Sequence, residues 1–332
     1  MRKARLTLET GGIYHVTSRI LEKKLLLDDT EKERMRETMW QVAGFCGVEV
    51  LTHCIMGNHF HILLEVPPKP GVLDAKRIAW HLEHLPKASS ARLSPAETFR
   101  ARLKCLEKRG LSPDGILDAY RERMFDLSRF VQEFKQRYTQ DYNRRHDRKG
   151  TLWEDRFHSV LLEPNARVLW KVAAYIDLNP LRAGLCTDPK DYRYCGYAGA
   201  AADEVRCLAG LHRLCELIEK AWSWKLDKAL AAYRVVLFGD AAPCPARGLR
   251  KAKAGLSDRA IRVVREVAGA LGLRENLMHK LRYLNESAIL GGRIFVEDQA
   301  QRYRERNRLR RMPVAKAIPS DSATAVEGLA RI

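Results

Sequence analysis

Two short apolar runs joined by a tight turn constrain the fold of this chain more than any other feature. Residues 48–55 and 59–66 are rich in aliphatic and β-branched side chains, as buried strands are. Gly57 and Asn58, which lie between the two runs, favour tight turns. So short a link joins only antiparallel neighbours. The two runs therefore predict an antiparallel β-hairpin.

The segments before the hairpin indicate the fold class. Residues 12–19 follow a Gly-Gly pair and have the β-branched and aromatic composition of a strand. Asp28 can cap a helix that runs to about Phe45. The order strand, helix, strand, strand is the first part of a ferredoxin-like layer. We therefore expect an α+β fold with an antiparallel sheet and packed helices.

The rest of the chain predicts a helical insertion, a second half of the layer and a helical C-terminal region. After Pro67, Pro68 and Pro70 end the sheet, charged and mostly helical residues continue to about 127. Ser128 can cap a helix over 129–145, and a strand over 152–162 and a helix over 166–178 follow. We divide the chain into a catalytic domain (1–200) with an insertion at about 69–127, a helical extension (201–240), a basic linker (241–256) and a helical, basic C-terminal region (257–332).

Charge indicates the class of partner. The 332 residues hold 59 Lys and Arg against 41 Asp and Glu, a net charge of +18. An excess of this size favours a polyanionic partner. The chain has neither an 18-residue apolar run nor an apolar segment typical of a secretory signal, so nucleic acid is a better candidate than a membrane. Eight scattered cysteines without a Cys-x-x-Cys pair indicate free thiols and a cytoplasmic location.

The hairpin contains a histidine pair with the spacing of a metal site. His59 and His61 flank Phe60, and alternation along a strand turns both imidazoles to one face. Two neutral imidazoles can hold a divalent cation and leave positions open for a substrate oxygen. The same triplet also occurs in ordinary packing. In a basic protein, the natural reaction for such a cation is phosphodiester chemistry, which also requires a nucleophile.

A later helix offers that nucleophile. Tyr175 and Asn179 lie four residues apart within residues 171–180, so they share one helix face. A tyrosine beside Val172 and Ile176 is also typical of packing against a sheet. Joined to the histidine pair, Tyr175 supplies a hydroxyl nucleophile and Asn179 a further ligand atom.

Three segments in series carry a family resemblance. They are Gly57-Asn-His-Phe-His-Ile-Leu-Leu-Glu65, residues 136–146 with Gly150-Thr-Leu-Trp-Glu-Asp-Arg-Phe-His158, and Ala174-Tyr-Ile-Asp-Leu-Asn-Pro-Leu-Arg-Ala-Gly184. Together they resemble the REP-associated tyrosine transposases, which are relatives of the IS200/IS605 transposases in the HUH endonuclease superfamily. The resemblance covers roughly residues 8–198.

The resemblance implies a reaction and assigns roles. His59 and His61 match a pair that binds Mg²⁺ or Mn²⁺, and Asn179 matches the polar residue expected as a third ligand. Tyr175 matches the nucleophile that attacks single-stranded DNA, leaving a 5′-phosphotyrosine and a free 3′-hydroxyl. The expected function is cleavage and rejoining at hairpin-forming repeats. Two alternatives remain open: a catalytically silent DNA-binding protein and a metal-dependent nuclease that uses water.

Other tyrosines and one glutamate compete for places in this site. Tyr138 and Tyr142 also lie four apart, but neither is followed by the amide of the motif, so a packing or DNA-contacting role is preferred. Glu65 shares the strand parity of the histidines, so it could lie at the edge of the site, but a solvated charge at a strand end is the preferred interpretation.

Basic residues near residue 150 predict DNA contacts. Trp153 and Phe157 could stack on bases or pack in the core, and the arginines at 302–311 could form a DNA-contacting arm or a tail. Two helices around Gly272 fit a helix-turn-helix or a plain bundle. The insertion could be a lid, a dimer surface or a hairpin-binding element, and both monomer and homodimer stay open. The predicted DNA-binding residues are Arg144, Arg145, Arg148, Lys149, Trp153 and Arg156.

Overall fold

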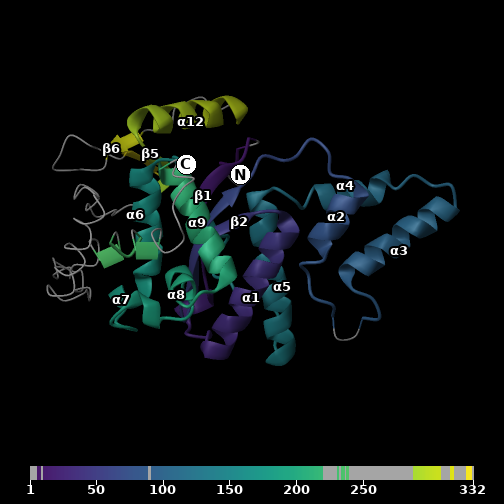
Figure 1. The fold of residues 1–332 in the computed structure, drawn as a ribbon, viewed down its shortest axis with the longest axis horizontal. Helices are drawn as coiled ribbons and strands as arrows, with labels where there is room; N and C mark the ends of the chain where they lie inside the picture. Colours follow the sequence, from purple (N-terminus) through teal and green to yellow (C-terminus); the bar gives the residue numbers. More distant parts are fainter. Residues whose placement is uncertain are drawn as a thin grey trace.

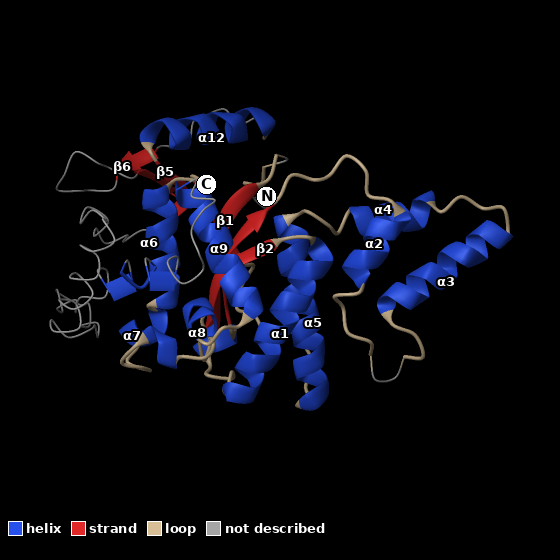
Figure 2. Ribbon diagram, in the orientation of Figure 1, coloured by secondary structure: helices blue, strands red, loops and turns tan. Residues whose placement is uncertain are grey.

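The computed structural model shows a mixed sheet with helices on both faces (Figures 1 and 2). It describes residues 6–8, 10–88, 91–219, 230–231, 233–235, 237–238, 287–307, 315–317 and 327–330. The strands are β1 (Gly12–Arg19), β2 (Glu49–Ile55), β3 (His59–Val66), β4 (His158–Leu162), β5 (Ser287–Gly291), β6 (Ala315–Ala317) and β7 (Glu327–Ala330). The helices are α1 (Asp29–Cys46), α2 (Ala75–Leu82), α3 (Pro95–Lys108), α4 (Asp114–Arg121), α5 (Leu127–Arg145), α6 (Ala166–Asp177), α7 (Asn179–Arg182), α8 (Gly196–Ala201), α9 (Val205–Glu219) and α12 (Arg293–Arg306).

The first four strands form the predicted ferredoxin-like layer. The sheet order is β2-β3-β1-β4-β5-β7-β6, and β2, β3, β1 and β4 pair antiparallel with their neighbours. The side chain of Asp28 accepts a hydrogen bond from the Glu31 amide and begins α1, as the sequence predicts. Helix α5 begins two residues earlier than expected, because Asp126 rather than Ser128 caps it. The α+β fold class is therefore confirmed.

Alternation along the strands separates two cores. Phe60, Ile62 and Leu64 of β3 pack with residues of α1 and α5. Leu63 of the same strand lies on the opposite face and packs with residues of α6, α8 and α9. His59 and His61 share the parity of Leu63, so the histidine pair faces the α6 side of the sheet.

The sequence suggested a helical C-terminal region, but the structure also shows strands there. Strand β5 pairs in parallel with β4, and β7 and β6 extend the sheet beyond it. Helix α12 covers the start of the arginine-rich run that was expected to be helical. The basic linker at 241–256 and the two helices expected around Gly272 lie outside the described residues.

The insertion is helical and projects to one side, beyond α1 and α5 (Figure 1). Helix α2 contacts α1 through His81, whose Nδ1 lies 2.7 Å from the carbonyl oxygen of Gly44. Apolar side chains of α2, α3 and α4, such as Ile78, Phe99 and Leu117, join the core of the α1–α5 face. The insertion thus packs on the helical layer opposite the histidine pair.

Candidate active site

The pairing of β1 with β3 collects three histidines on one face of the sheet. Thr17 pairs with His61 and His15 pairs with Leu63, so His15 lies diagonally next to His61. The His15 and His61 ring centroids are 5.2 Å apart and the rings are nearly parallel, while the His59 and His61 centroids are 5.1 Å apart. Of these three, only His59 and His61 were predicted as site residues.

Helix α6 carries the predicted tyrosine beneath this face. Asn165 caps the helix by accepting a hydrogen bond from the Val168 amide, and the helix ends shortly before Pro180. Between residues 168 and 181, every side chain is buried except those of Tyr175 and Asn179, which are half-buried. Helical spacing therefore places the two partly accessible side chains of this stretch on one face, as the sequence predicts.

Tyr175 contacts the histidine cluster directly. Its ring centroid lies 5.7 Å from that of His61 and 6.1 Å from that of His15, edge to face in both cases. The guanidinium carbon of Arg182 lies 5.8 Å from the Tyr175 ring centroid. The structure thus joins the predicted nucleophile to the predicted ligand His61 within one chain.

Burial keeps the histidines in the form that binds metals. Burial lowers the pKa of His59 to about 4, with a smaller contribution from the nearby charge of Arg19. Burial also lowers the pKa of His61, and the neighbouring His15, His59 and Arg19 add to that effect. Both imidazoles are therefore neutral near pH 7, with a lone pair available on one ring nitrogen.

The hydrogen bonds of the two imidazoles fit a divalent cation. Nδ1 of His59 lies 2.7 Å from Asn58 Oδ1, and Nδ1 of His61 lies 3.0 Å from His15 Nε2. Within the described residues, neither Nε2 atom has a hydrogen-bond partner. Among those same residues, no group of three His, Cys, Asp or Glu side chains could hold a metal ion. A cation here would thus rely on the two imidazoles and on a ligand of another type.

Asn179 is the predicted third ligand. In the structure, its side-chain amide nitrogen makes hydrogen bonds. Nδ2 donates to the carbonyl oxygens of Tyr175 and Ile176, at 2.8 and 3.3 Å. These bonds turn the amide nitrogen toward the end of α6, so Oδ1 is the atom that could bind a cation. Its role as a ligand stays a prediction.

A buried aspartate anchors the tyrosine helix. Asp177 is fully buried two residues after Tyr175 and accepts hydrogen bonds from Thr52 Oγ1 of β2, the Tyr197 amide and the Tyr233 hydroxyl. Burial raises the pKa of Asp177 to about 6, although these hydrogen bonds act to lower it. The anchor fixes α6, and with it Tyr175, relative to the sheet.

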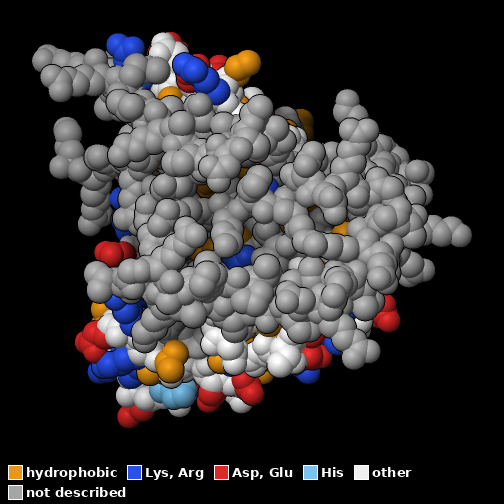
Figure 3. Space-filling model, turned by 90° about the vertical axis from the view of Figure 1, so that its left-hand side faces the viewer, with side chains coloured by type: hydrophobic (Ala, Val, Ile, Leu, Met, Phe, Trp, Pro, Cys, Tyr) orange, Lys and Arg blue, Asp and Glu red, His pale blue; other side chains and the backbone are white. Residues whose placement is uncertain are grey.

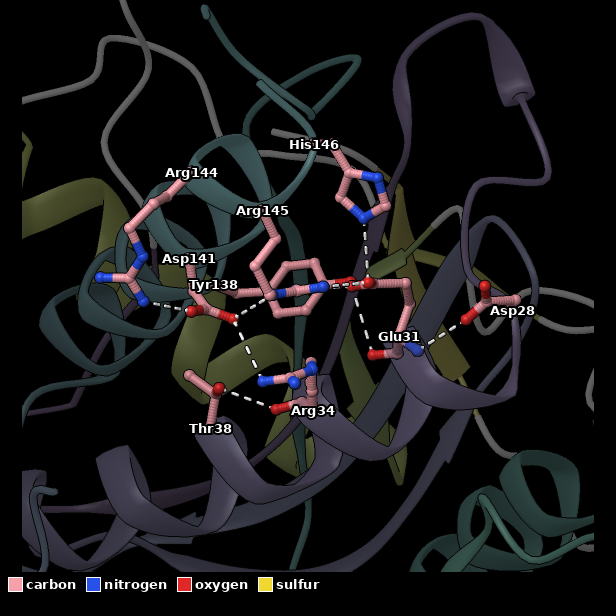
Figure 4. A network of polar contacts seen from close by, with 9 residues as sticks. All are labelled: Asp28, Glu31, Arg34, Thr38, Tyr138, Asp141, Arg144, Arg145 and His146. Atoms are coloured by element: carbon pink, nitrogen blue, oxygen red, sulfur yellow. Dashed lines mark hydrogen bonds and ion pairs between the residues drawn. The ribbon is translucent and has the colours of Figure 1, made fainter. Parts of the chain in front are cut away.

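Two of the predicted DNA-binding arginines belong to an ion-pair network on α1 and α5 (Figure 4). Arg145 donates to the buried Glu31 of α1, with one contact at 2.8 Å, and to Asp141 at 2.9 Å. Arg144 pairs with Asp141 at 2.6 Å and remains mostly exposed. Arg145 therefore joins two helices, whereas DNA contact by the exposed Arg144 stays a prediction.

Of the other predicted DNA-binding residues, one is buried in the core and three are partly or fully exposed. Trp153 is 7% exposed, its indole N–H donates to Thr139 Oγ1 at 2.8 Å, and its ring packs against Phe60. Trp153 therefore packs in the core, on the sheet face opposite the histidine pair, rather than being placed to stack on bases. Lys149 and Arg156 are exposed, and Arg148 is half-buried with a hydrogen bond to the Thr151 carbonyl oxygen. DNA contact stays a prediction for these three cations.

The rival tyrosines do not join the histidine cluster. Tyr138 is buried and donates to Glu31 Oε2 at 2.9 Å, while the Tyr142 ring stacks on His146. Burial and the neighbouring Glu31 raise the pKa of Tyr138. Both tyrosines come from α5, on the face away from Tyr175.

The expectation that Glu65 is a solvated charge was wrong. The two carboxylate oxygens of Glu65 accept hydrogen bonds from Arg213 of α9, at 2.8 and 3.0 Å. Its side chain is only 15% exposed. The sequence missed this role because the partner lies 148 residues away.

Three residues of the site were missed by the sequence reasoning. They are His15, Arg19, which pairs in register with His59, and Arg182 beside Tyr175. The alternation of side chains along β1 could have indicated His15 and Arg19, because both share one face of that strand with Thr17. What the sequence lacked was the register between β1 and β3.

Two further properties concern thiols and helix length. The seven cysteines within the described residues are free, as the sequence indicates. None of the helices in the described part of the chain has the length and apolar character needed to cross a membrane.

Comparison with known proteins finds a family similarity in the first part of the chain. Residues 10–79 match the family model described as "Transposase IS200 like". The matched segment contains β1, α1, β2 and β3, and with them all three histidines of the cluster, but it ends before Tyr175. The sequence-based recognition of this transposase family is confirmed over these residues.

A solved structure described as a REP-associated tyrosine transposase bound to a REP hairpin is also similar. The two sequences are 15% identical, the match covers 61% of this chain and 86% of the other, and the TM-score is 0.38. The curated proteins contain no match to this chain.

Proposed function

With residues 10–79 matching the IS200-like transposases, we propose that this protein is a metal-dependent transposase that cleaves and rejoins single-stranded DNA. Its substrate is DNA that folds into hairpins at repeats, the class implied by the three sequence motifs. Its cofactor is Mg²⁺ or Mn²⁺. Because Tyr175 and the histidine pair come from the same chain, a monomer holds the complete set of reacting groups.

The observation that carries this proposal is the contact between Tyr175 and His61. Tyr175 is the half-buried tyrosine of an otherwise buried helix segment, and its ring meets the His61 ring at 5.7 Å between centroids. Its helical neighbours Val172 and Ile176 are completely buried. Its partial exposure beside two potential metal ligands fits a nucleophile that must reach a phosphate.

The proposed reaction is a transesterification at phosphorus. The Tyr175 Oη atom forms a bond to the phosphorus, and the bond from phosphorus to the 3′-oxygen breaks. The tyrosine hydroxyl loses its proton and the departing 3′-oxygen gains one, so no net proton is consumed. The 5′-phosphotyrosine keeps the bond energy for rejoining, when a 3′-hydroxyl attacks the same phosphorus and releases Tyr175.

The residues around the tyrosine support that step. His59 and His61, with Asn179, would hold the cation, which polarises the phosphate and offsets its developing charge. Arg182 lies over the Tyr175 ring and adds a positive charge beside the hydroxyl-bearing side chain. The carboxylate of Asp177 holds α6 in place from the buried side.

The test uses labelled hairpin-containing single-stranded DNA with Mn²⁺. We expect an adduct between protein and DNA that survives denaturation, is lost in Tyr175→Phe and persists in the matched control Tyr142→Phe. Tyr142 is also a helical tyrosine beside arginines, but its ring stacks on His146 outside the cluster. The His61→Ala variant should also lose the adduct.

Other outcomes of this test identify the alternatives. Cleavage without an adduct would mean that water is the nucleophile. Binding without cleavage at any tested Mg²⁺ or Mn²⁺ concentration would indicate a catalytically silent DNA-binding protein. An adduct that persists in Tyr175→Phe would reject Tyr175 as the nucleophile.

A further inference from the structure

Each histidine of the pair contacts a second side chain through its Nδ1 atom. For His59 that side chain is Asn58, the preceding residue in the turn, and for His61 it is His15 on the neighbouring strand. None of the sequence motifs assigns a role to His15 or Asn58. Their hydrogen bonds decide which ring nitrogen of each histidine is left for a metal ion.

The Asn58 amide fixes the tautomer of His59. Its Nδ2 donates to the carbonyl oxygen of Lys23 at 2.8 Å, so its Oδ1 is the atom that faces His59, at 2.7 Å. A carbonyl oxygen only accepts, so the proton of the neutral His59 ring resides on Nδ1. The lone pair of His59 is therefore on Nε2.

His15 can do the same for His61. One proton lies between His15 Nε2 and His61 Nδ1, which are 3.0 Å apart, and either nitrogen can carry it. If His61 donates, its Nε2 keeps a lone pair for the cation. If His15 donates, His61 carries its proton on Nε2 and cannot bind there. Metal binding by the pair therefore requires His61 to donate to His15.

The surroundings of His15 suit this role. It is completely buried, and its ring is stacked within 11° of parallel to that of His61, which keeps the two nitrogens aligned. Its strand position is set by the β1–β3 register, in which Thr17 faces His61 directly. A buried polar side chain is costly unless it is hydrogen-bonded, and the contact with His61 supplies such a bond to His15.

We infer that Asn58 and His15 are positioning residues that accept the Nδ1 protons of His59 and His61 and thereby present both Nε2 atoms to a divalent cation. The inference rests on the proposed metal-dependent function. It assigns the two residues no contact with the cation itself. Loss of either acceptor should weaken metal binding about 10- to 100-fold, the usual effect of removing the partner of a ligating histidine.

The first experiment measures Mn²⁺ affinity of the full-length protein without DNA, by electron paramagnetic resonance of free Mn²⁺. His15→Phe keeps the ring but removes the acceptor, and Asn58→Leu removes the amide. Both should weaken binding about 10- to 100-fold. His15→Gln, whose amide oxygen can accept the same proton, should restore affinity to within a few-fold of wild type.

His53→Phe is the matched control. His53 is also fully buried, on the adjacent strand β2, and among the described residues neither of its ring nitrogens has a hydrogen-bond partner. It faces the α1 side of the sheet, where its ring meets Trp40. Its substitution should leave Mn²⁺ affinity unchanged.

The second readout is the tautomer of His61. Histidine ¹⁵N shifts of the Mg²⁺-loaded protein should show His59 and His61 both protonated on Nδ1, and His15→Phe should shift His61 toward the other tautomer. If His61 is protonated on Nε2 in the loaded wild type, the inference is overturned. Because the shifts report on a folded protein, they also separate lost positioning from lost structure.

The outcomes also separate this inference from the proposed function. If His61→Ala abolishes Mn²⁺ binding but His15→Phe and Asn58→Leu do not weaken it, the positioning role is wrong and the metal site stands. If wild-type protein and His61→Ala bind Mn²⁺ equally, the proposed metal function itself fails, and the inference fails with it.

Discussion

Arg19 is the cation closest in register to the proposed metal ligands. It ends β1, pairs with His59 across the sheet and has an exposed side chain. Within the described residues it takes part in no ion pair. A guanidinium at this position can bind a phosphate bidentately, as arginines commonly do. The geometry therefore suits a contact to the DNA backbone beside the scissile phosphate.

Replacing Arg19 tests this contact. Arg19→Ala should weaken binding of single-stranded DNA about tenfold and reduce the slope of log K against log salt by roughly 0.7, the value for one lost phosphate contact. Fluorescence anisotropy across a salt series measures both. Arg129→Ala, which changes an exposed arginine of α5 on the other face, should alter neither. An unchanged salt slope in Arg19→Ala would rule out the contact.

At this scale, the sequence predicts residues whose role depends on local spacing. His59 and His61 follow from strand alternation, and Tyr175 and Asn179 from helical spacing. Roles that depend on distant partners stay hidden. Arg145 reads as a DNA-binding arginine in a basic segment, but its carboxylate partner Glu31 lies 114 residues earlier. No local pattern could reveal that pairing.

At the scale of elements, the buried Glu31 joins α1 to α5. It accepts hydrogen bonds from Arg145, His146 and Tyr138 (Figure 4). Burial alone would raise the pKa of Glu31, but the bonds from these three side chains outweigh it and hold the pKa at about 2. The folded state therefore favours the charged carboxylate, whose ordinary pKa is near 4.5.

This difference makes stability depend on pH in a defined direction. Since the folded pKa is depressed, the contribution of Glu31 is complete above pH 5 and is lost as pH falls toward 2. Glu31→Gln should lower the free energy of unfolding by about 3 kcal/mol at pH 7 and by much less at pH 2.5. Urea unfolding at both pH values measures this. Glu154→Gln, at an exposed loop position, should change neither value.

The anchor of α6 has the opposite pH dependence. The folded pKa of Asp177 is raised to about 6 by burial, so stability from this group is present below pH 4 and is lost as pH rises through 6. The hydrogen bond from Thr52 opposes that loss, because it stabilises the charged form. Thr52→Val should therefore cost about 2 kcal/mol at pH 8 and less at pH 5.

Urea unfolding of Thr52→Val at the two pH values tests the anchor. Thr38→Val, at a half-buried threonine of α1 whose hydroxyl bonds its own helix, is the control and should have a small, pH-independent effect. Equal losses at pH 5 and pH 8 would contradict a charged Asp177 as the acceptor. Adduct formation should fall in Thr52→Val if the anchor also keeps Tyr175 in position.

The elements predicted best are those with their own start and stop signals. The strands 12–19 and 59–66 and the helix after Asn165 agree with the structure because turns and caps mark their ends. Strand β5 was missed because its five residues owe their conformation to pairing with β4, far away in sequence. Strand formation by such short segments is set by tertiary contacts.

At the scale of the whole molecule, the chain carries a net charge of +18. On the described part of the surface in Figure 3, Lys and Arg side chains are interspersed with Asp and Glu. Many arginines are paired, such as Arg36 with Glu33 and Glu204. Helix α3 of the insertion differs. Within the described residues, its exposed cations Arg102, Lys104 and Lys108, together with the adjacent Arg109, have no ion-pair partners.

These cations predict an electrostatic role for the insertion, because its helical core does not require them. Phe99 and Ala96 already bury the inner face of α3, so charge on the outer face is available to a partner. A hairpin stem carries closely spaced phosphates, to which unpaired cations bind with counterion release. Of the three roles that the sequence left open for the insertion, hairpin binding is the one that uses this charge.

Replacing Arg102, Lys104, Lys108 and Arg109 with Gln tests hairpin binding. The variant should bind hairpin DNA about tenfold more weakly, with a salt slope reduced by up to about 0.9 for each lost contact. Its adduct yield on a short single strand without a hairpin should be unchanged, because the Tyr175 cluster lies on the other face of the sheet. Glu107→Gln, an exposed change of opposite sign in α3, should not weaken binding. If hairpin affinity is unchanged in the fourfold variant, α3 does not contact DNA and the lid or dimer role gains support.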